Sequence, residues 1–362
     1  MSIPKSSRRQ FIQSAAAAAS LAAVGGYNLK ARAQSRGPLL VSQGLTPLKY
    51  TLSWLPSSMD TPLITAILKG YFAEEGLEVT YERGFGSADS ITKIAAGQYD
   101  LGEGDPYSMI EFNAKNPDVP LVAIYVHFNR SPFGIYTLKG KGITEPAQLA
   151  GKKLGAPAGD APRRLWPVFA KQVGIDPGSV EWLTMEPQLR EPFLIQGRVD
   201  AISGFMTSAM PNLVRGGVSL NDITPFLYND YGLELYGNAV ITRVQLLREK
   251  PEQLKAFLRA YVKGWQDTIR DTDGNMLALL DKAKADGQVL DTAIEKLRLT
   301  LAMPRLFVTD EVRQIGLGDV VPARMETSIA QVVDGFGLPT RPSLEQVFDR
   351  SLLPPKSERM IG

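Results

Sequence analysis

Aromatic and acidic side chains that could bind a small molecule stand at the ends of two predicted strands. Trp54 ends a strand over residues 48–54, and Glu103 and Asp105 stand at the end of a strand over residues 99–104. An indole ring can stack on a flat ligand, and carboxylates can accept hydrogen bonds from a donor-rich or cationic one. Each feature also has a plainer interpretation, because Trp54 can pack between elements and the two acids can lie in a solvated loop.

Predicted helix starts supply further candidates, because the first turn of a helix has free backbone N–H groups and partial positive charge. Asp60 and Thr61 stand at one such start, where they can bind a ligand or merely cap the helix. Gly86 and Ser87 stand at another, where small residues let a ligand approach the backbone, although a tight turn needs them equally.

A third helix start, over residues 159–166, contains Asp160, Arg163 and Arg164. An arginine beside free N–H groups would favour a carboxylate or sulfonate ligand, which it can bind through two parallel hydrogen bonds. The alternative is a role in surface solubility, and at least one of the two arginines is expected to be exposed.

The remaining candidates follow later strands. Phe205 and Met206 come directly after one strand, and Tyr236 and Asn238 stand where the chain is expected to return to its first half. His127 is the only histidine of the chain and ends an apolar strand. A lone histidine in such a place is more often a core or hinge residue than a ligand.

The composition narrows the chemistry that these residues could support. The chain has 362 residues with no Cys and one His, which excludes disulfides, thiol nucleophiles, Cys-ligated metals and pairs of His ligands. A net charge of +2 gives no sign of a nucleic-acid partner. These absences make an enzyme a weaker expectation, and we expect no catalytic residues, metal or cofactor.

The first 33 residues have the pattern of an export signal. Residues 7–13 (SRRQFIQ) resemble the twin-arginine consensus, and residues 31–33 (ARA) fit a small-x-small cleavage site after Ala33. The apolar stretch between them covers residues 14–24, which is shorter than the roughly 20 residues that a membrane-spanning helix needs. The prediction is therefore cleavage and a periplasmic location, rather than a short amphipathic or membrane helix.

Strands and helices alternate up to about residue 242, which predicts parallel sheets with helices on both faces. Beyond Pro251 the pattern is almost entirely helical. Polar breaks at residues 129–132 and 233–237 indicate two crossings between lobes. The expected organisation is a flexible leader over residues 34–46, a first lobe over residues 47–130 plus 236–362, and a second lobe over residues 131–235.

Motifs in both halves resemble those of one protein family. They are Trp54-Leu55-Pro56, residues 70–79 (GYFAEEGLEV), residues 94–102 (IAAGQYDLG), residues 149–155 (LAGKKLG), residues 196–201 (QGRVDA) and Gly237-Asn238. They resemble the solute-binding proteins of ABC importers, in the NMT1/THI5-like branch for thiamine-pyrimidine precursors, sulfonates, taurine and nitrate. The resemblance covers most of residues 48–350 and is specific to the superfamily rather than to one ligand.

This resemblance implies an α/β periplasmic binding protein fold, type II-like, with two lobes joined by a two-strand hinge and a helical C-terminal tail. It implies a monomer that captures a small planar organic molecule, which could be anionic, and delivers it to an ABC permease in the inner membrane with its ATPase. A pyrimidine-type precursor is favoured by Trp54-Leu55-Pro56, while sulfonate, taurine, nitrate and an aromatic carboxylate stay open. Glu103 departs from the small or neutral residue that is usual there.

Two other functions stay open beside an importer. One is an enzyme on the same scaffold, since the resemblance extends to two enzymes, a pyrimidine synthase with a Cys-rich motif and a desulfinase with a Cys nucleophile. Neither motif can be carried over to a chain without Cys. The other is a sensor that presents its ligand to a membrane receptor. The sequence does not distinguish a sensor from an importer component, because both act through the same closed form.

Overall fold

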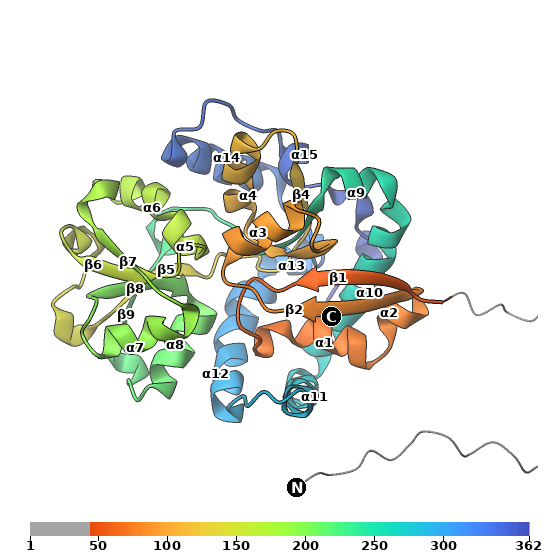
Figure 1. Ribbon diagram of the computed structural model, residues 1–362, viewed down its shortest axis with the longest axis horizontal. Coiled ribbons are helices and arrows are strands. Elements are labelled where there is room, and N and C mark those ends of the chain that lie inside the picture. Colours follow the sequence, from red (N-terminus) through yellow and green to blue (C-terminus); the bar gives the residue numbers. More distant parts are fainter. Residues whose placement is uncertain (1–43, 362) are drawn as a thin grey trace, which may run out of the picture. The chain divides into compact units, whose positions relative to one another are not determined.

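The computed structural model describes residues 44–361 (Figure 1). The predicted signal and residues 34–43 of the predicted leader lie outside the described residues. Thr46 is already the first residue of a strand, so the leader was predicted to extend slightly too far. Within residues 44–361, no helix has the length and apolar character to cross a bilayer.

Two five-stranded sheets form the framework. The first has the order β2-β1-β3-β10-β4, and the second has the order β7-β6-β8-β5-β9. The strands of the first sheet are Thr46–Thr51 (β1), Leu77–Glu82 (β2), Leu101–Gly104 (β3), Leu121–Val126 (β4) and Ala239–Arg243 (β10). Those of the second sheet are Phe133–Leu138 (β5), Lys153–Ala156 (β6), Glu181–Thr184 (β7), Ala201–Phe205 (β8) and Ile223–Leu227 (β9). We call the parts built on these sheets lobe 1 and lobe 2, and residues 251–361 the tail.

Both sheets are mixed, so the prediction of parallel sheets was wrong for two strands. β10 runs antiparallel to β3 and β4, and β5 runs antiparallel to β8 and β9. Each of these is the strand by which the chain enters a sheet from the other lobe. It therefore has the opposite direction to the strands that follow one another through helices on the same sheet.

Helices cover the sheets and make up most of the tail (Figure 1). In lobe 1 they are Thr61–Leu68 (α1), Tyr71–Glu74 (α2), Ser87–Ala95 (α3), Pro106–Lys115 (α4) and Val244–Glu249 (α9). In lobe 2 they are Ala161–Arg164 (α5), Trp166–Gln172 (α6), Arg190–Ile195 (α7) and Met206–Arg215 (α8). In the tail they are Pro251–Arg270 (α10), Thr272–Ala285 (α11), Thr292–Ala302 (α12), Asp310–Ile315 (α13), Pro322–Phe336 (α14) and Leu344–Val347 (α15).

The long helix α10 shows how the sequence pattern becomes packing. Its apolar residues recur at helical spacing and form one buried stripe, which includes Leu254, Phe257, Leu258, Tyr261 and Trp265. α10 packs against α1 of lobe 1. Gly264 permits this close approach, since a Cβ atom there would lie 2.2 Å from the carbonyl oxygen of Pro62.

Two segments cross between the sheets, over residues 127–132 and 228–238. Backbone hydrogen bonds join them, such as the one from Gly237 N–H to the carbonyl oxygen of Phe128 (2.9 Å). The crossings therefore form a paired hinge at the two polar breaks of the sequence. The exact domain limits within them stay a prediction.

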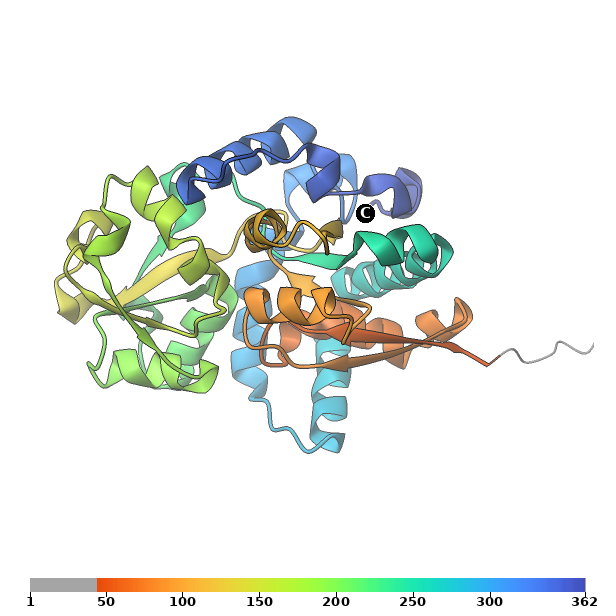
Figure 2. The same ribbon diagram turned by 45° about the horizontal axis from the view of Figure 1, so that its top comes forward.

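The tail contacts both lobes, although the sequence assigned it to lobe 1. α10 packs on α1, whereas α12 packs on α8 and α14 packs on α6, both of which belong to lobe 2. Figures 1 and 2 show α12 beside lobe 2, and Figure 2 shows the α14 region extending over it. The tail helices are therefore a further connection between the lobes besides the hinge.

Candidate functional site

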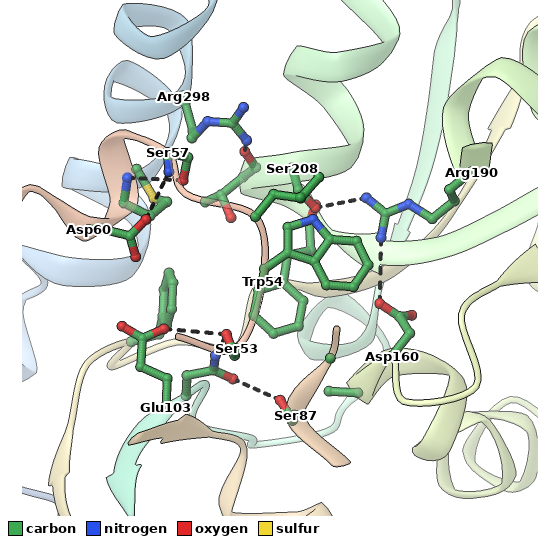
Figure 3. A pocket seen from close by; sticks show the side chains of 18 residues that line it. Ser53, Trp54, Ser57, Asp60, Ser87, Glu103, Asp160, Arg190, Ser208 and Arg298 are labelled. Atoms are coloured by element: carbon green, nitrogen blue, oxygen red, sulfur yellow. Dashed lines mark hydrogen bonds and ion pairs between the residues drawn. The ribbon is translucent and has the colours of Figure 1, made fainter. Parts of the chain in front are cut away.

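A pocket lies between the lobes, at the carboxyl ends of β1, β3 and β8 (Figure 3). The cavity volume is about 50 Å³, within about 560 Å³ of empty space among the lining atoms that is partly open to solvent. The pocket is therefore narrow and suits a small molecule. Crevices beyond the carboxyl ends of strands are the usual ligand sites of open α/β sheets.

The pocket contains eight of the thirteen predicted site residues. They are Trp54, Asp60, Gly86, Ser87, Glu103, Asp160, Phe205 and Asn238. They come from the loop after β1, the start of α3, β3, the start of α5, the end of β8 and the second crossing. The rule that placed them was the position after a strand or at a helix start.

Thr61 and Asp105 lie outside the pocket lining, because their side chains form hydrogen bonds with the backbone. The Thr61 hydroxyl donates to the carbonyl oxygen of Ser58 (2.7 Å). Asp105 is buried as the N-cap of α4, where one carboxylate oxygen accepts from the backbone N–H groups of Tyr107 (3.1 Å) and Ser108 (2.7 Å). The interpretation of Glu103 and Asp105 as a pair of site carboxylates was therefore wrong for Asp105.

Arg163 also lies outside the pocket lining. Its guanidinium donates to a backbone carbonyl at the end of β6 (2.7 Å) and to the Thr184 hydroxyl (3.0 Å), and it lies 5.0 Å from the ring centre of Trp182. Arg164 instead pairs with Glu111 of α4 (2.6 Å), which joins the two lobes. Neither arginine supplies the anion site that the sequence suggested.

Met206 and Tyr236 belong to the hinge side of the molecule. Met206 is buried and lines a separate groove beside the crossings. The Tyr236 hydroxyl donates to Glu311 of the tail (2.7 Å), which also accepts from the Asn129 side chain (2.8 Å), and the guanidinium of Arg324 lies 3.9 Å from the Tyr236 ring centre. Tyr236 thus braces the two crossings against the tail.

The acidic side of the pocket consists of Asp60 and Glu103. Asp60 accepts from the backbone N–H of Ser57 (2.8 Å), and Glu103 accepts from the Ser53 hydroxyl (3.3 Å). Burial raises the pKa of Glu103 to about 7, and burial together with the charge of Glu103 raises the pKa of Asp60 well above its usual range. Among residues 44–361, neither carboxylate has a cation within ion-pair distance.

A short polar chain leads to Glu103 along the wall of the pocket. The Ser87 hydroxyl donates to the Asn238 side-chain oxygen (3.5 Å), and the Asn238 side-chain N–H donates to the Ser53 hydroxyl (2.8 Å). Ser53 in turn donates to Glu103, so these hydrogen bonds orient the acid in the wall of the pocket. Ser53 was not a sequence candidate.

The opposite side of the pocket also contains charged side chains, but these form ion pairs with one another. Arg190 is fully buried and donates to Glu191 (2.6 and 3.0 Å), to the Ser208 hydroxyl (2.9 Å) and to Asp160 (3.5 Å). Its guanidinium lies 4.9 Å from the ring centre of Trp54. In Figure 3, Asp60 and Glu103 lie on one side of the Trp54 ring, and Arg190 and Asp160 lie on the other.

Ten lining residues were not among the sequence candidates. They are Ser53, Leu55, Ser57, Met59, Phe128, Ala161, Arg190, Thr207, Ser208 and Arg298. Arg190 could have been found, because it stands beside a predicted helix start after a strand. Arg298 could also have been noticed, since it shares the apolar face of its helix with Ile294 and Leu299. An arginine is rarely buried on such a face unless it has a specific partner.

His127 lies in the first crossing and is buried in lobe 1, away from the pocket lining. Its Nδ1 atom pairs with the Tyr261 hydroxyl (2.7 Å), while Nε2 has no partner among the described residues. Burial lowers the pKa of His127 to about 3, so the imidazole stays neutral at ordinary pH. This is the core or hinge role expected of a lone histidine.

The chain is similar to curated proteins of two kinds. It is 27% identical over 267 residues to the formylaminopyrimidine-binding protein of Halalkalibacterium halodurans, covering 73% of this chain and 79% of that protein. It is 25% identical over 236 residues to the 4-amino-5-hydroxymethyl-2-methylpyrimidine phosphate synthase THI13 of Saccharomyces cerevisiae, covering 62% of this chain and 67% of that protein. A binding protein and an enzyme thus stand among its relatives.

Among solved structures, the alkanesulfonate-binding protein SsuA of Xanthomonas axonopodis pv. citri aligns with a TM-score of 0.63 at 15% identity, covering 84% of this chain and 98% of that one. The likeness confirms the periplasmic binding protein fold that the sequence predicted. The family model described as NMT1/THI5 like matches residues 58–274. Because this match spans more than half of the chain, the protein belongs to the NMT1/THI5-like family.

Proposed function

We propose that this protein is the substrate-binding component of an ABC importer and that its ligand is a small flat heterocycle of the 4-aminopyrimidine class. The family membership and the narrow pocket between the lobes support the binding role. The name of the Halalkalibacterium halodurans relative supports the pyrimidine class. The ligand would occupy the space beside Trp54, facing Asp60 and Glu103.

The observation that carries the ligand class is the pair of pocket carboxyls, Asp60 and Glu103, which lack a cation partner within residues 44–361. A 4-aminopyrimidine has an amino donor next to a ring nitrogen that accepts a proton or a hydrogen bond. A carboxylate can accept from the amino group, and a protonated carboxyl can donate to the ring nitrogen. The raised pKa of Glu103 permits either state near neutral pH.

An anionic ligand fits this pocket poorly, which argues against the sulfonate, taurine, nitrate and carboxylate alternatives. The two arginines that line the pocket already serve other acceptors. Arg190 pairs with Glu191 and Asp160, and Arg298 pairs with Glu295. An added anion would face Asp60 and Glu103 without a free cation from either arginine, and the burial of an unpaired charge is costly.

The partners and the location follow from the same proposal. A closed, ligand-bound form would dock on an ABC permease in the inner membrane, which an ATPase drives, and we propose that the protein acts there as a monomer. We propose that the twin-arginine signal directs it to the periplasm and is cleaved after Ala33. Mass measurement of the mature protein tests the cleavage, and native mass spectrometry tests the monomer.

Calorimetry with 4-amino-5-hydroxymethyl-2-methylpyrimidine tests the ligand class. Its 4-oxo analogue is the matched control ligand, because it reverses the pattern of the two groups, with a carbonyl acceptor for the amino donor and an N–H donor for the ring acceptor, at nearly the same size and shape. We expect binding of the amino compound and at least tenfold weaker binding of the oxo compound, since loss of a hydrogen bond to a charged carboxylate costs about 1.5–3 kcal/mol. Binding of taurine, MOPS or nitrate without binding of the aminopyrimidine would contradict the proposal.

The alternative of catalysis has two observations in its favour, the raised pKa of Glu103 in a pocket and the synthase among the relatives. Against it, the chain has no Cys, and its only imidazole lies outside the pocket lining. Incubation of the protein with the aminopyrimidine, followed by mass spectrometry of the recovered compound, separates the two functions. A binding protein returns the compound unchanged, whereas a changed compound would favour an enzyme.

A further inference from the structure

A buried ion pair on the tail helix α12 lies where the two lobes meet the pocket. Glu295 and Arg298 stand one turn apart, and their side chains are 3% and 6% exposed. The guanidinium donates to both carboxylate oxygens, through Nε (3.0 Å) and through Nη2 (3.2 Å). Arg298 also lines the pocket, and Figure 3 shows it above the space between Asp60 and Trp54.

Glu295 connects this ion pair to lobe 1. Its carboxylate accepts from the backbone N–H of Ser58 (2.7 Å), and its backbone carbonyl accepts from the Ser58 hydroxyl (2.9 Å). Ser58 belongs to the turn over residues 58–60, which also carries Asp60 and is capped by Ser57. The tail therefore holds the loop that presents an acidic group to the pocket.

Arg298 connects the same ion pair to lobe 2. Its Nη1 atom donates to the carbonyl oxygen of Thr207, and Nη2 donates to the side-chain oxygen of Asn212 (3.4 Å). Both residues belong to α8, and Thr207 lines the pocket. A continuous set of buried hydrogen bonds thus runs from the turn of lobe 1, through α12, to the first turn of α8.

We propose that Arg298 is a positioning residue that, with Glu295, latches the two lobes together over the pocket. Opening of the lobes must separate either Ser58 from Glu295 or Thr207 from Arg298, whichever lobe α12 follows. Each separation leaves a charged group without a partner that it has in the closed form. The latch therefore favours the closed form and slows the release of a bound molecule. It connects the two lobes through α12, separately from the hinge.

The distance between the lobes tests this latch without any knowledge of the ligand. The chain has no Cys, so spin labels on Glu78→Cys in lobe 1 and Gln188→Cys in lobe 2, both exposed, would be unique. In ligand-free protein, we expect Arg298→Met to reduce the short-distance population at least threefold. Lys296→Met on the same helix is the matched control, because its ion pair with Asp273 is exposed, and it should leave the distances unchanged.

A second variant guards against a loss of folding, since Arg298→Met leaves Glu295 buried without its partner. The double variant Glu295→Gln/Arg298→Met removes both charges and should also show fewer closed molecules at an unchanged melting temperature. With 4-amino-5-hydroxymethyl-2-methylpyrimidine as probe, both variants should release it at least tenfold faster. Distance distributions equal to those of the wild type would overturn the latch, whereas failure of the probe to bind would count against the proposed ligand alone.

Discussion

The backbones of the two lobes meet at Gly86 and Gly159. The backbone N–H of Ala88, in the first turn of α3, donates to the carbonyl oxygen of Gly159 in lobe 2 (3.3 Å). Gly86 has φ 121° and ψ 160°, a conformation that only glycine adopts readily. A Cβ atom at Gly86 would lie 2.2 Å from the Gly159 oxygen, so Gly86→Ala should prevent full closure.

The size of this effect follows from the geometry. The Gly159 oxygen would have to retreat by about 1.2 Å, from 2.2 Å to the 3.4 Å of an ordinary contact. A ligand hydrogen bond of about 2.9 Å to one lobe would then stretch beyond 4 Å, which ends it as a hydrogen bond. Loss of one bond to a charged group costs about 1.5–3 kcal/mol, so we expect about ten- to hundredfold weaker binding.

Calorimetry with 4-amino-5-hydroxymethyl-2-methylpyrimidine measures this loss, and the melting temperature reports whether the variant folds. Gly159→Ala is the matched control across the same contact, because its Cβ atom would lie 3.3 Å from the nearest atom, the carbonyl oxygen of Phe85. We expect its affinity to stay within about threefold of the wild type. If folded Gly86→Ala bound the compound as tightly as Gly159→Ala, closure at this contact would not be needed for binding.

Three further substitutions have expected outcomes. Burial raises the pKa of Glu103 from 4.5 to about 7, so the wild type should lose up to about 3 kcal/mol of unfolding free energy as pH rises through this range. Glu103→Gln should lose less over the same range, in which Asp60 still contributes because burial raises its pKa too; an equal loss of unfolding free energy for the two proteins between pH 5 and pH 8 would count against the shift. Burial lowers the pKa of His127 from 6.5 to about 3, so the free energy of unfolding should fall as pH falls through this range. His127→Gln should reduce this fall when the free energy is measured by urea titration at several pH values, and an unchanged fall would refute the lowered pKa of His127. Arg163→Ala removes a side chain outside the pocket lining and should change the affinity for the probe less than threefold by calorimetry; a loss above tenfold would place Arg163 in recognition.

The sequence predicted the fold well because the fold depends on patterns that short segments carry. The buried run of β4 and the apolar stripe of α10 are visible as strand and helix patterns without any knowledge of their neighbours. Strand direction cannot be predicted in this way. β10 and β5 are antiparallel to their neighbours because the chain enters each of these strands from the other lobe. That information lies in the topology and not in the five or six residues of each strand.

Site residues were predictable where their position relative to a strand end or a helix start places them in the pocket. Trp54, Glu103 and Asp160 were found because each stands after a strand or at a helix start. Whether such a side chain faces the pocket depends on competing partners, and Arg163 turns instead to Thr184 and a backbone carbonyl. Arg298 reaches the pocket from the tail, 91 residues after Thr207 in the chain, and only the packing of α12 on α8 brings the two together.

The position of β10 sets an order for the making of this protein. β10 lies between β3 and β4, so the first sheet cannot be completed until the ribosome has passed residue 243. All strands of the second sheet have been synthesised by then, and lobe 2 can assemble first on the nascent chain. Until then β3 has one unpaired edge and β4 has no neighbouring strand, and unpaired strand edges are templates for aggregation. A chain that ended before β10 would thus present proteases with a finished second sheet and an open first one.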